Sequence, residues 1–282
     1  MAGRRENKAL LPVLEVAAVT EFQRRLLDWY SANGRNLPWR RTRDPYAVLV
    51  SEIMLQQTQV SRVIPKYHAW LRAYPRLEDL AAAPLDAVLR SWQGLGYNTR
   101  ARRLRDCAAA AVKSAAGGDA TLPRTLPELL CLPGLGPYTA RALLVFVCDQ
   151  DLAAVDTNVR RVLTHEFGLS PDLGATDLQA LAETVLPRGR SRDWHNALMD
   201  YGALVLTARV SGVTSLRRQD RFVGSRRWQR SRLLQSVLAR GPQTIGDLAL
   251  VMDLSPNVVA ELIALLERDG LLTSGPGGVR IA

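Results

Sequence analysis

The sequence predicts a mainly helical protein that ends in a small two-stranded hairpin. Between residues 20 and 205 no strand-like alternation of polar and apolar residues recurs. Apolar residues recur at helical spacing instead, and Pro and Gly interrupt them. Near the C-terminus, a Gly-Pro-Gly-Gly turn lies between two short apolar segments, which is typical of a hairpin. The predicted fold class is therefore all-α, with a separate small domain at the end.

Several of the expected helices begin at recognisable start signals. Asp44 precedes Pro45, and Asp156 precedes Thr157, as capping residues do. We expect residues 1–18 to form a flexible N-terminus. The helices expected after it are Glu21–Ala32, Pro45–Leu55, Gln59–Tyr74, Leu77–Ala83, Pro84–Arg90, Thr99–Ala115, Thr125–Cys131, Pro137–Val147, Thr157–Phe167, Asp177–Leu186 and Arg192–Thr207.

The C-terminal segment, residues 226–282, has the element order of a winged-helix module. One helix ends at Gly241-Pro242, a second covers Thr244–Met252, and a third runs from Ser255 to Gly270. Two strands then flank the glycine-rich turn, which completes the order of three helices and a hairpin. Because the third helix carries more acidic than basic residues, we expect it to pack against protein rather than against phosphate.

Composition excludes several classes of protein. The chain has 282 residues, 47% of them hydrophobic and 23% charged, which excludes a disordered, collagen-like or coiled-coil protein. Three cysteines without CxxC spacing build neither a disulfide framework nor a four-thiolate metal site. The longest apolar run is too short for a membrane span, and no secretory signal is evident. We expect a monomeric, cytoplasmic protein that does not bind membranes.

The net charge of +10 indicates a polyanionic partner, most commonly nucleic acid. Much of it lies in residues 209–232, where eight arginines face one acidic residue, Asp220. Such a stretch is either a solvated linker or a phosphate-binding segment, and the density of arginines favours phosphate. Within it, we single out Arg217, Arg218 and Arg221 as DNA-phosphate contacts.

The segment Leu132-Pro-Gly-Leu-Gly-Pro-Tyr-Thr-Ala140 lies between two expected helices. Gly134 and Gly136 allow a tight hairpin whose backbone N–H groups, with those of the following helix N-terminus, form a phosphate-binding arrangement. With Thr139, they are the predicted phosphate-binding residues of a helix-hairpin-helix. The alternative is a plain helix–turn–helix corner.

This segment and Val155-Asp-Thr-Asn-Val-Arg-Arg-Val162 together resemble the helix-hairpin-helix and Gly/Pro-Asp signature of a superfamily of base-excision DNA glycosylases. Ser51-Glu-Ile-Met-Leu-Gln-Gln-Thr-Gln-Val60 resembles the adenine DNA glycosylase (MutY-type) family in particular. Three shorter motifs support this resemblance, which covers roughly residues 20–207. They are Arg35-Asn-Leu-Pro-Trp-Arg40, Gly94-Leu-Gly-Tyr97 with the arginines at 100, 102 and 103, and Met199-Asp-Tyr-Gly202.

The resemblance implies a two-lobed core over residues 19–208, with a six-helix lobe at about 45–150 and a second lobe from 19–44 and 151–208. It also implies an enzyme that flips its target base out of the duplex. Glu52 would protonate the leaving adenine, and apolar neighbours would raise its pKa. Asp156 would stay ionised and stabilise the sugar cation. Without the resemblance, these two residues are a solvated helix carboxylate and an N-cap.

The resemblance also implies roles for other residues. Tyr138 stands where bifunctional relatives carry a Schiff-base lysine, and no lysine follows Lys113, so we expect a glycosylase without lyase activity. Asn158 belongs to the same catalytic group. Gln56, Gln57 and Tyr97 would fill or probe the vacated base stack. Arg35, Trp39, Arg40 and Asp200 would line or brace the adenine pocket. The less favoured alternative is that Trp39 and Tyr97 are ordinary core aromatics.

The sequence departs from the family in two ways. Members normally bind a [4Fe–4S] cluster through four cysteines, but this sequence has no cysteine after Cys148. We therefore expect no cluster, no other metal or cofactor, and a basic linker over residues 209–225 in the place of the cluster loop. A larger C-terminal domain that senses 8-oxoguanine is also not expected, which leaves the opposite base open.

The resulting interpretation is a nucleoid-associated base-excision enzyme that acts on double-stranded DNA containing a mispair. It would remove adenine opposite guanine or 8-oxoguanine. Two alternatives remain at this stage. One is a mismatch thymine or uracil glycosylase on the same scaffold, and the other is a DNA-binding protein without catalytic activity.

Overall fold

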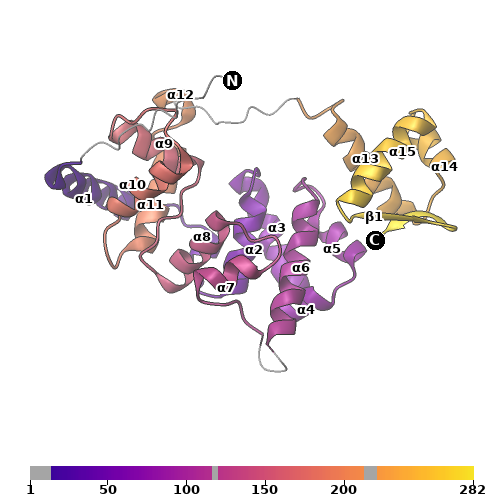
Figure 1. The fold of residues 1–282 in the computed structure, drawn as a ribbon, viewed down its shortest axis with the longest axis horizontal. Coiled ribbons are helices and arrows are strands. Elements are labelled where there is room, and N and C mark those ends of the chain that lie inside the picture. The colour runs from indigo at the N-terminus through magenta and orange to yellow at the C-terminus, as the bar shows by residue number, and fades with distance from the viewer. Residues whose placement is uncertain (1–13, 116–119, 213–220) are drawn as a thin grey trace, which may run out of the picture. The chain divides into compact units, whose positions relative to one another are not determined.

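The computed structural model describes residues 14–115, 120–212 and 221–282. They form helices almost throughout, with one two-stranded sheet at the C-terminal end (Figure 1). This confirms the predicted all-α class. The chain divides into two compact units: unit 1 comprises residues 1–44, 124–126 and 136–217, and unit 2 comprises residues 45–123, 127–135 and 218–282. The helix that follows the glycine hairpin thus belongs to unit 1, whereas the sequence places it in the six-helix lobe.

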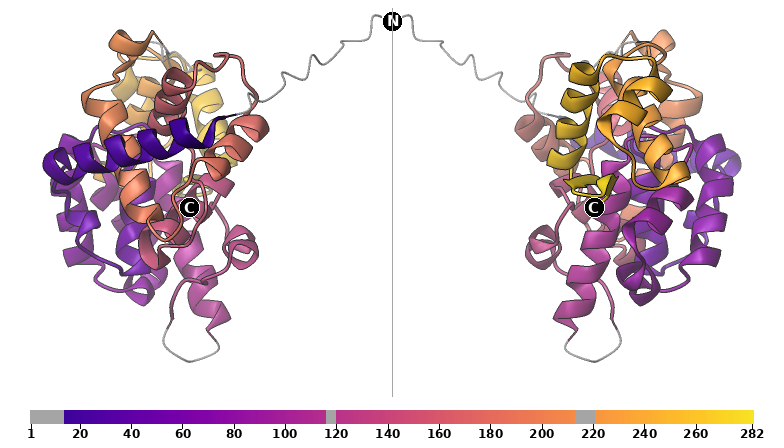
Figure 2. Two further views of the ribbon diagram at one scale, coloured as in Figure 1. Left: turned by 90° about the vertical axis from the view of Figure 1, so that its left-hand side faces the viewer. Right: turned by 90° about the vertical axis from the view of Figure 1, so that its right-hand side faces the viewer.

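Unit 1 is built on a long first helix that packs along the last long helix of the unit. The left view of Figure 2 shows this first helix in indigo, in front. It begins at Val16, five residues earlier than expected, because Leu14 and Val19 still pack against the core. Its elements are α1 (Val16–Asn33), η1 (Pro38–Arg40), α8 (Pro137–Cys148), α9 (Thr157–Glu166), α10 (Ala175–Thr184), α11 (Ser191–Leu204) and α12 (Ala208–Ser211).

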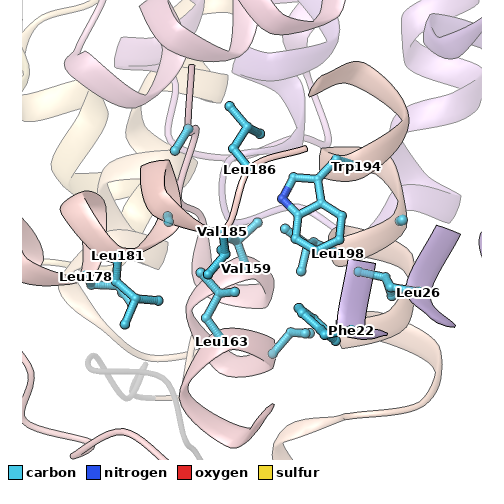
Figure 3. Close-up of a cluster of buried hydrophobic side chains, with 14 of the residues drawn as sticks. Phe22, Leu26, Val159, Leu163, Leu178, Leu181, Val185, Leu186, Trp194 and Leu198 are labelled. Carbon is cyan, nitrogen blue, oxygen red and sulfur yellow. The ribbon is translucent and has the colours of Figure 1, made fainter. Parts of the chain in front are cut away.

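The core of unit 1 is a single cluster of buried side chains (Figure 3). Phe22 from α1 meets the Trp194 ring of α11 edge-on at 5.3 Å between ring centroids. Val159 and Leu163 of α9 complete this contact from the side. Burial of such aromatic and branched side chains contributes roughly 1.5–3 kcal/mol each. The core therefore fixes α9, which follows Asp156, against α1 and α11.

Unit 2 contains the remaining helices and the sheet. Its helix α6 packs against α4 and α5, and Trp70 and Trp92 are fully buried among them. Pro65 lies inside α3 without ending it. The first helices of the unit are α2 (Pro45–Leu55), α3 (Val60–Ala73), α4 (Leu77–Ala82), α5 (Leu85–Trp92), α6 (Thr99–Ser114) and α7 (Leu126–Cys131), of which Leu126 falls in unit 1.

The C-terminal module, residues 221–282, belongs to unit 2 and has the predicted element order. Its helices start at side-chain caps: Ser225 before α13 (Arg226–Arg240), Thr244 before α14 (Ile245–Met252) and Ser255 before α15 (Pro256–Arg268). β1 (Leu272–Gly275) then pairs antiparallel with β2 (Gly278–Ile281), with Leu272 opposite Ile281. The likeness of this module to a winged helix stays a prediction.

Three features of unit 1 were not expected from the sequence: a 3₁₀ turn, an early end of α11 and the short helix α12. Residues 38–40 form a single 3₁₀ turn, and the helix expected over Arg192–Thr207 ends at Leu204. Thr207 is extended, with ψ of 162°, and caps the short helix α12, whose last residue, Ser211, donates its backbone N–H to the Thr207 carbonyl. Helix α12 therefore overlaps the start of the predicted linker. In the described part of the chain, no single helix is long and apolar enough to cross a membrane; α14 and α15 pass that test only jointly, across a 107° bend.

Candidate functional site

Asp156 caps helix α9 with its carboxylate. Oδ1 accepts from the backbone N–H groups of Asn158 at 2.8 Å and Val159 at 2.7 Å. Oδ2 accepts from the Asn158 side-chain amide at 2.9 Å. Burial raises the pKa of Asp156 above its usual value, while these hydrogen bonds and the charge of Arg161 act in the opposite direction. The predicted N-cap is confirmed, and the ionised state expected of this carboxylate stays a prediction.

Asn158 links this cap to helix α11. Its side-chain oxygen accepts from Arg161 at 3.0 Å, and the same guanidinium nitrogen donates to the Gly202 carbonyl at 2.9 Å. A Cβ atom at Gly202 would lie 2.8 Å from the Asn158 Cβ. The glycine of the Met199–Gly202 motif is thus required by close packing on Asn158. Arg161 and Gly202 were present in the quoted motifs, but sequence reasoning gave them no role.

Asp200 holds the Arg35–Arg40 segment through an ion-pair network. Its fully buried carboxylate lies 2.7 Å from the Arg35 Nε and 2.7 Å from one Arg40 guanidinium nitrogen. It also accepts from the Arg35 backbone N–H at 2.7 Å. Burial alone would raise the pKa of Asp200, but Arg40 and Arg35 outweigh it and hold the pKa below 3.8. The structure therefore brings three of the four predicted pocket residues together as a brace.

Trp39, the fourth predicted pocket residue, lies in the 3₁₀ turn between Arg35 and Arg40 and is 7% exposed. It occupies a core position, as the alternative interpretation of the sequence had it. Next to the brace, Arg192 donates to the carbonyls of Arg40 at 2.6 Å and Thr42 at 3.0 Å. The segment that carries Trp39 is thus held by hydrogen bonds along most of its length.

His195 is a buried histidine that sequence reasoning missed. Its Nε2 accepts from the Ala154 backbone N–H at 2.9 Å, and its Nδ1 lies 2.7 Å from the Ser191 carbonyl. These partners require the neutral ring with the proton on Nδ1. Burial lowers the pKa of His195 below 6.5, although the Ser191 carbonyl, Glu183 and Asp149 act to raise it. His195 therefore positions the backbone two residues before Asp156.

Glu52 lies on α2 and is 7% exposed. Val50 and Met54 beside it are fully buried, and Ile53 is 5% exposed. This excludes a solvated helix carboxylate, which was the alternative for this residue. Glu52 belongs to unit 2, whereas Asp156 belongs to unit 1.

Tyr97 and Gln57 lie in exposed turns of unit 2. Both have left-handed backbone conformations, with φ of 46° and 57°, which non-glycine residues rarely adopt. The Tyr97 side chain is 41% exposed, which excludes the core position considered for it, and Gln56 is partly buried. Such backbone conformations persist only where surrounding contacts hold them.

Many of those contacts come from one buried side chain, Arg100 of α6, while Trp92 also donates to the Gly96 carbonyl at 3.0 Å. Its guanidinium donates to the carbonyls of Leu95 at 2.9 Å and Gly96 at 3.0 Å, in the turn that carries Tyr97. It also donates to the carbonyls at the end of α2, including Ile53 at 2.8 Å and Gln56. Burial lowers the pKa of Arg100 to about 10. Arg100 thus ties both turns to α6. The sequence motif includes this arginine, but nothing in the motif indicates this role.

The glycine hairpin is exposed at both glycines. Gly134 has φ of 82°, and a Cβ atom there would lie 2.8 Å from the Arg103 Cβ, so both conformation and packing require glycine. Gly136 is the N-cap of α8, with open space where a Cβ would be. The Thr139 residue is 3% exposed, and its phosphate contact stays a prediction. Tyr138 is partly buried.

Residues 50–188 match the family model of the HhH-GPD superfamily base excision DNA repair proteins. The adenine DNA glycosylase of Mycolicibacterium smegmatis is 41% identical over 230 residues, which cover 74% of this chain and 78% of that protein. The chain belongs to the HhH-GPD superfamily.

Two further comparisons agree with this HhH-GPD assignment. The mouse (Mus musculus) adenine DNA glycosylase is 42% identical over 68% of this chain, which spans only 39% of that protein. Among solved structures, a thermostable thymine-DNA glycosylase has a TM-score of 0.64 and 32% identity, over 68% of this chain and 89% of that one. These comparisons therefore show the helix-hairpin-helix core of the family.

The donor set of this HhH-GPD chain does not fit the iron–sulfur cluster that the family resemblance implies. Its three cysteines are too few for a four-thiolate cluster and lie on different helices: Cys107 on α6, Cys131 on α7 and Cys148 on α8. Burial raises the pKa of Cys107 to about 12, which disfavours the thiolate that ligation needs. Of the predicted phosphate contacts, Arg221 is exposed, and Arg217 and Arg218 lie outside the described residues.

Proposed function

We propose that this chain is a DNA glycosylase that removes adenine mispaired with guanine or 8-oxoguanine from double-stranded DNA. Membership of the HhH-GPD superfamily supports base excision as the class of reaction. The relatives at 41% and 42% identity, both named adenine DNA glycosylase, support adenine as the base. The observation that carries the proposal is the burial of Glu52, since the decapeptide 51–60 that resembles the adenine family presents a carboxyl shielded from bulk water.

In this proposal Glu52 is the general acid. Breaking the bond between adenine N9 and the sugar C1′ leaves an electron pair on the base and positive charge on the sugar. A proton delivered from the Glu52 carboxyl to adenine N7 lets the base leave neutral. The ionised Glu52 then accepts a proton from the water that attacks C1′, which restores the acid. The position of Glu52 on α2, where it is 7% exposed, keeps its carboxyl out of bulk water, as a general acid of this kind requires.

Asp156 has the opposite task, to stabilise the sugar cation while ionised. The two N–H groups at the N-terminus of α9 and the Asn158 amide hold its carboxylate in one orientation. These donors, the helix dipole and Arg161 favour the ionised form against burial. Asn158 is a positioning residue in this scheme, and His195 positions the backbone that precedes Asp156.

We further propose that the enzyme lacks lyase activity and needs no cofactor. Tyr138 occupies the helix start where bifunctional relatives would carry an amine, and the sequence has no lysine after Lys113. Borohydride added during turnover is therefore expected to trap no protein–DNA adduct. A trapped adduct would contradict this part of the proposal. The monomeric state and a cytoplasmic, nucleoid-associated location stay predictions from the sequence.

A thymine or uracil glycosylase remains the second candidate, because the thermostable thymine-DNA glycosylase has the same core at 32% identity. One assay separates the candidates. The purified protein is incubated with duplexes that carry a single A:G, A:8-oxoG, T:G or U:G pair, and alkali-labile sites are scored. We expect cleavage at the adenine of the first two duplexes. Cleavage only in the last two would establish the second candidate, and binding without cleavage of any would indicate a non-catalytic protein.

A further inference from the structure

The C-terminal module contacts helix α6 through the end of α15. The Arg102 Nε of α6 donates to the Asp269 carbonyl at 2.9 Å. Gly270 has φ of 64°, and a Cβ atom there would lie 3.1 Å from the same nitrogen. Arg230 of α13 pairs with the Asp269 carboxylate, and Arg226 pairs with Glu261 of α15 at 2.7 Å. Two acidic side chains of the module, Glu261 of α15 and Asp269 at its C-cap, are thus paired with arginines of α13.

A second contact joins the module to Tyr97. The Arg227 guanidinium of α13 donates to the Tyr97 hydroxyl at 2.5 Å. Its central carbon also lies 5.6 Å from the centre of the Tyr97 ring. Arg100 lies at the same distance, 5.6 Å, from that ring. Two guanidinium groups therefore hold one exposed aromatic ring whose backbone is left-handed.

This arrangement has the chemistry of a nucleic-acid contact. An exposed aromatic ring beside arginines stacks on a base while the cations approach the phosphate backbone. The hydrogen bond to the Tyr97 hydroxyl fixes the ring torsion, which a buried aromatic would obtain from packing alone. A cation–π contact at the surface favours one side-chain orientation among the available rotamers.

We propose that Arg227 is a positioning residue that holds Tyr97 for contact with the mispaired base pair, so that the C-terminal module takes part in recognising mispaired duplex DNA. This inference rests on the proposed function, since it needs mispaired duplex as the ligand. It gives the module a task other than packing or tethering. The contact acts through Tyr97, and Arg227 itself takes no part in the chemistry.

A double-mutant cycle in the full-length protein tests this proposal. Arg227→Ala removes the guanidinium, Tyr97→Phe removes only the hydroxyl, and the third variant combines them. The quantity measured is mispair preference, the ratio of the dissociation constants for matched and A:G duplex. We expect each single variant to lower this preference roughly tenfold, about 1.4 kcal/mol. We expect the double variant to lower it no further, because both remove the same contact.

Two additional variants serve as controls. Arg227→Lys keeps a donor for the hydroxyl, and we expect it to recover most of the preference. Arg240→Ala removes the same charge from the exposed end of α13, and we expect it to leave the preference unchanged. Tyr97→Phe keeps the test decisive if Arg227→Ala fails to fold.

Three results would overturn the proposal. Equal weakening on matched and mispaired duplex, with the salt slope reduced by about 0.9, would make Arg227 a simple phosphate contact. Faster excision by Arg227→Ala would mean that the contact restrains Tyr97. An unchanged preference would leave the module without a part in recognition. Failure of the unaltered protein to excise adenine would refute the proposed function, whereas normal excision with unchanged preference in Arg227→Ala refutes this inference alone.

Discussion

The Asp156 segment of unit 1 and the Tyr97 turn of unit 2 hold their side chains by different means. Around Asp156, the carboxylate accepts three hydrogen bonds from its own helix, and His195 fixes the backbone before it. Around Tyr97, the backbone is left-handed, the ring is exposed, and arginines hold it from outside. The first arrangement suits a group whose charge must be controlled, and the second suits a group that must meet a large ligand. Substitutions in unit 1 and in unit 2 test the two arrangements separately.

The largest expected effect on unit 1 comes from the Asp200 brace. Asp200→Asn leaves Arg35 and Arg40 partly buried without their carboxylate, so we expect the free energy of unfolding to fall by about 3 kcal/mol. Urea denaturation at pH 7 measures this. Asp28→Asn, an exposed residue of α1, is the control and should change stability by less than about 0.5 kcal/mol. A loss as small as that in Asp200→Asn would show that the brace does not hold the segment.

On unit 2, Arg100→Met tests whether one arginine holds both turns. The change removes the charged donor of the Leu95 and Gly96 carbonyls, which keep Thr58 and Trp92 as neutral donors. It also removes the donor to the Ile53 and Met54 carbonyls at the end of α2, and an unsatisfied buried group costs about 1–3 kcal/mol. We expect a net loss of roughly 2 kcal/mol and a Tyr97 turn that exchanges its amide protons faster. Arg90→Met, on the exposed face of α5, is the matched control. Unchanged exchange at the turn would remove Arg100 from this role.

A smaller effect concerns pH and His195. Since burial lowers the pKa of His195 in the folded state, the unfolded chain takes up a proton first as pH falls below 6.5. The stability that the neutral ring provides above pH 6.5 is therefore lost as pH falls toward the folded pKa. The slope for one proton is at most about 1.4 kcal/mol per pH unit. His195→Gln, which keeps an acceptor but does not titrate, should show a shallower decline; parallel curves would contradict this.

The sequence predicted the helical class and most helix positions, because those depend on periodicity and caps, and its contiguous motifs named the candidate site residues, whose roles stay predictions. It placed Asp156 at an N-cap and Gly136 at a helix start, where local spacing is sufficient information. It missed His195 and the roles of Arg161 and Arg100. Their partners lie many residues away in the chain, so no local pattern marks them.

Boundaries failed where tertiary contacts override local signals. The first helix starts early because Val19 still contacts the core, and α11 ends at Leu204 although no Pro follows it before residue 208. The burial of Thr139 and Trp39 likewise depends on neighbours that the sequence does not bring together. The contact between Arg227 and Tyr97, 130 residues apart, is of the same kind.

The most direct test of the central claim compares Asp156→Asn with the unaltered protein. Asparagine also caps helices well, so the variant keeps the α9 start while it removes the charge and the oxygen that accepts from the Asn158 amide. The single-turnover rate of adenine excision and the affinity for A:G duplex are measured side by side. We expect the rate to fall at least about a hundredfold, with affinity within roughly threefold, a change of under about 0.7 kcal/mol. A rate close to that of the unaltered protein, or a parallel loss of affinity that accounts for the lost rate, would contradict the assignment of the chemistry to Asp156.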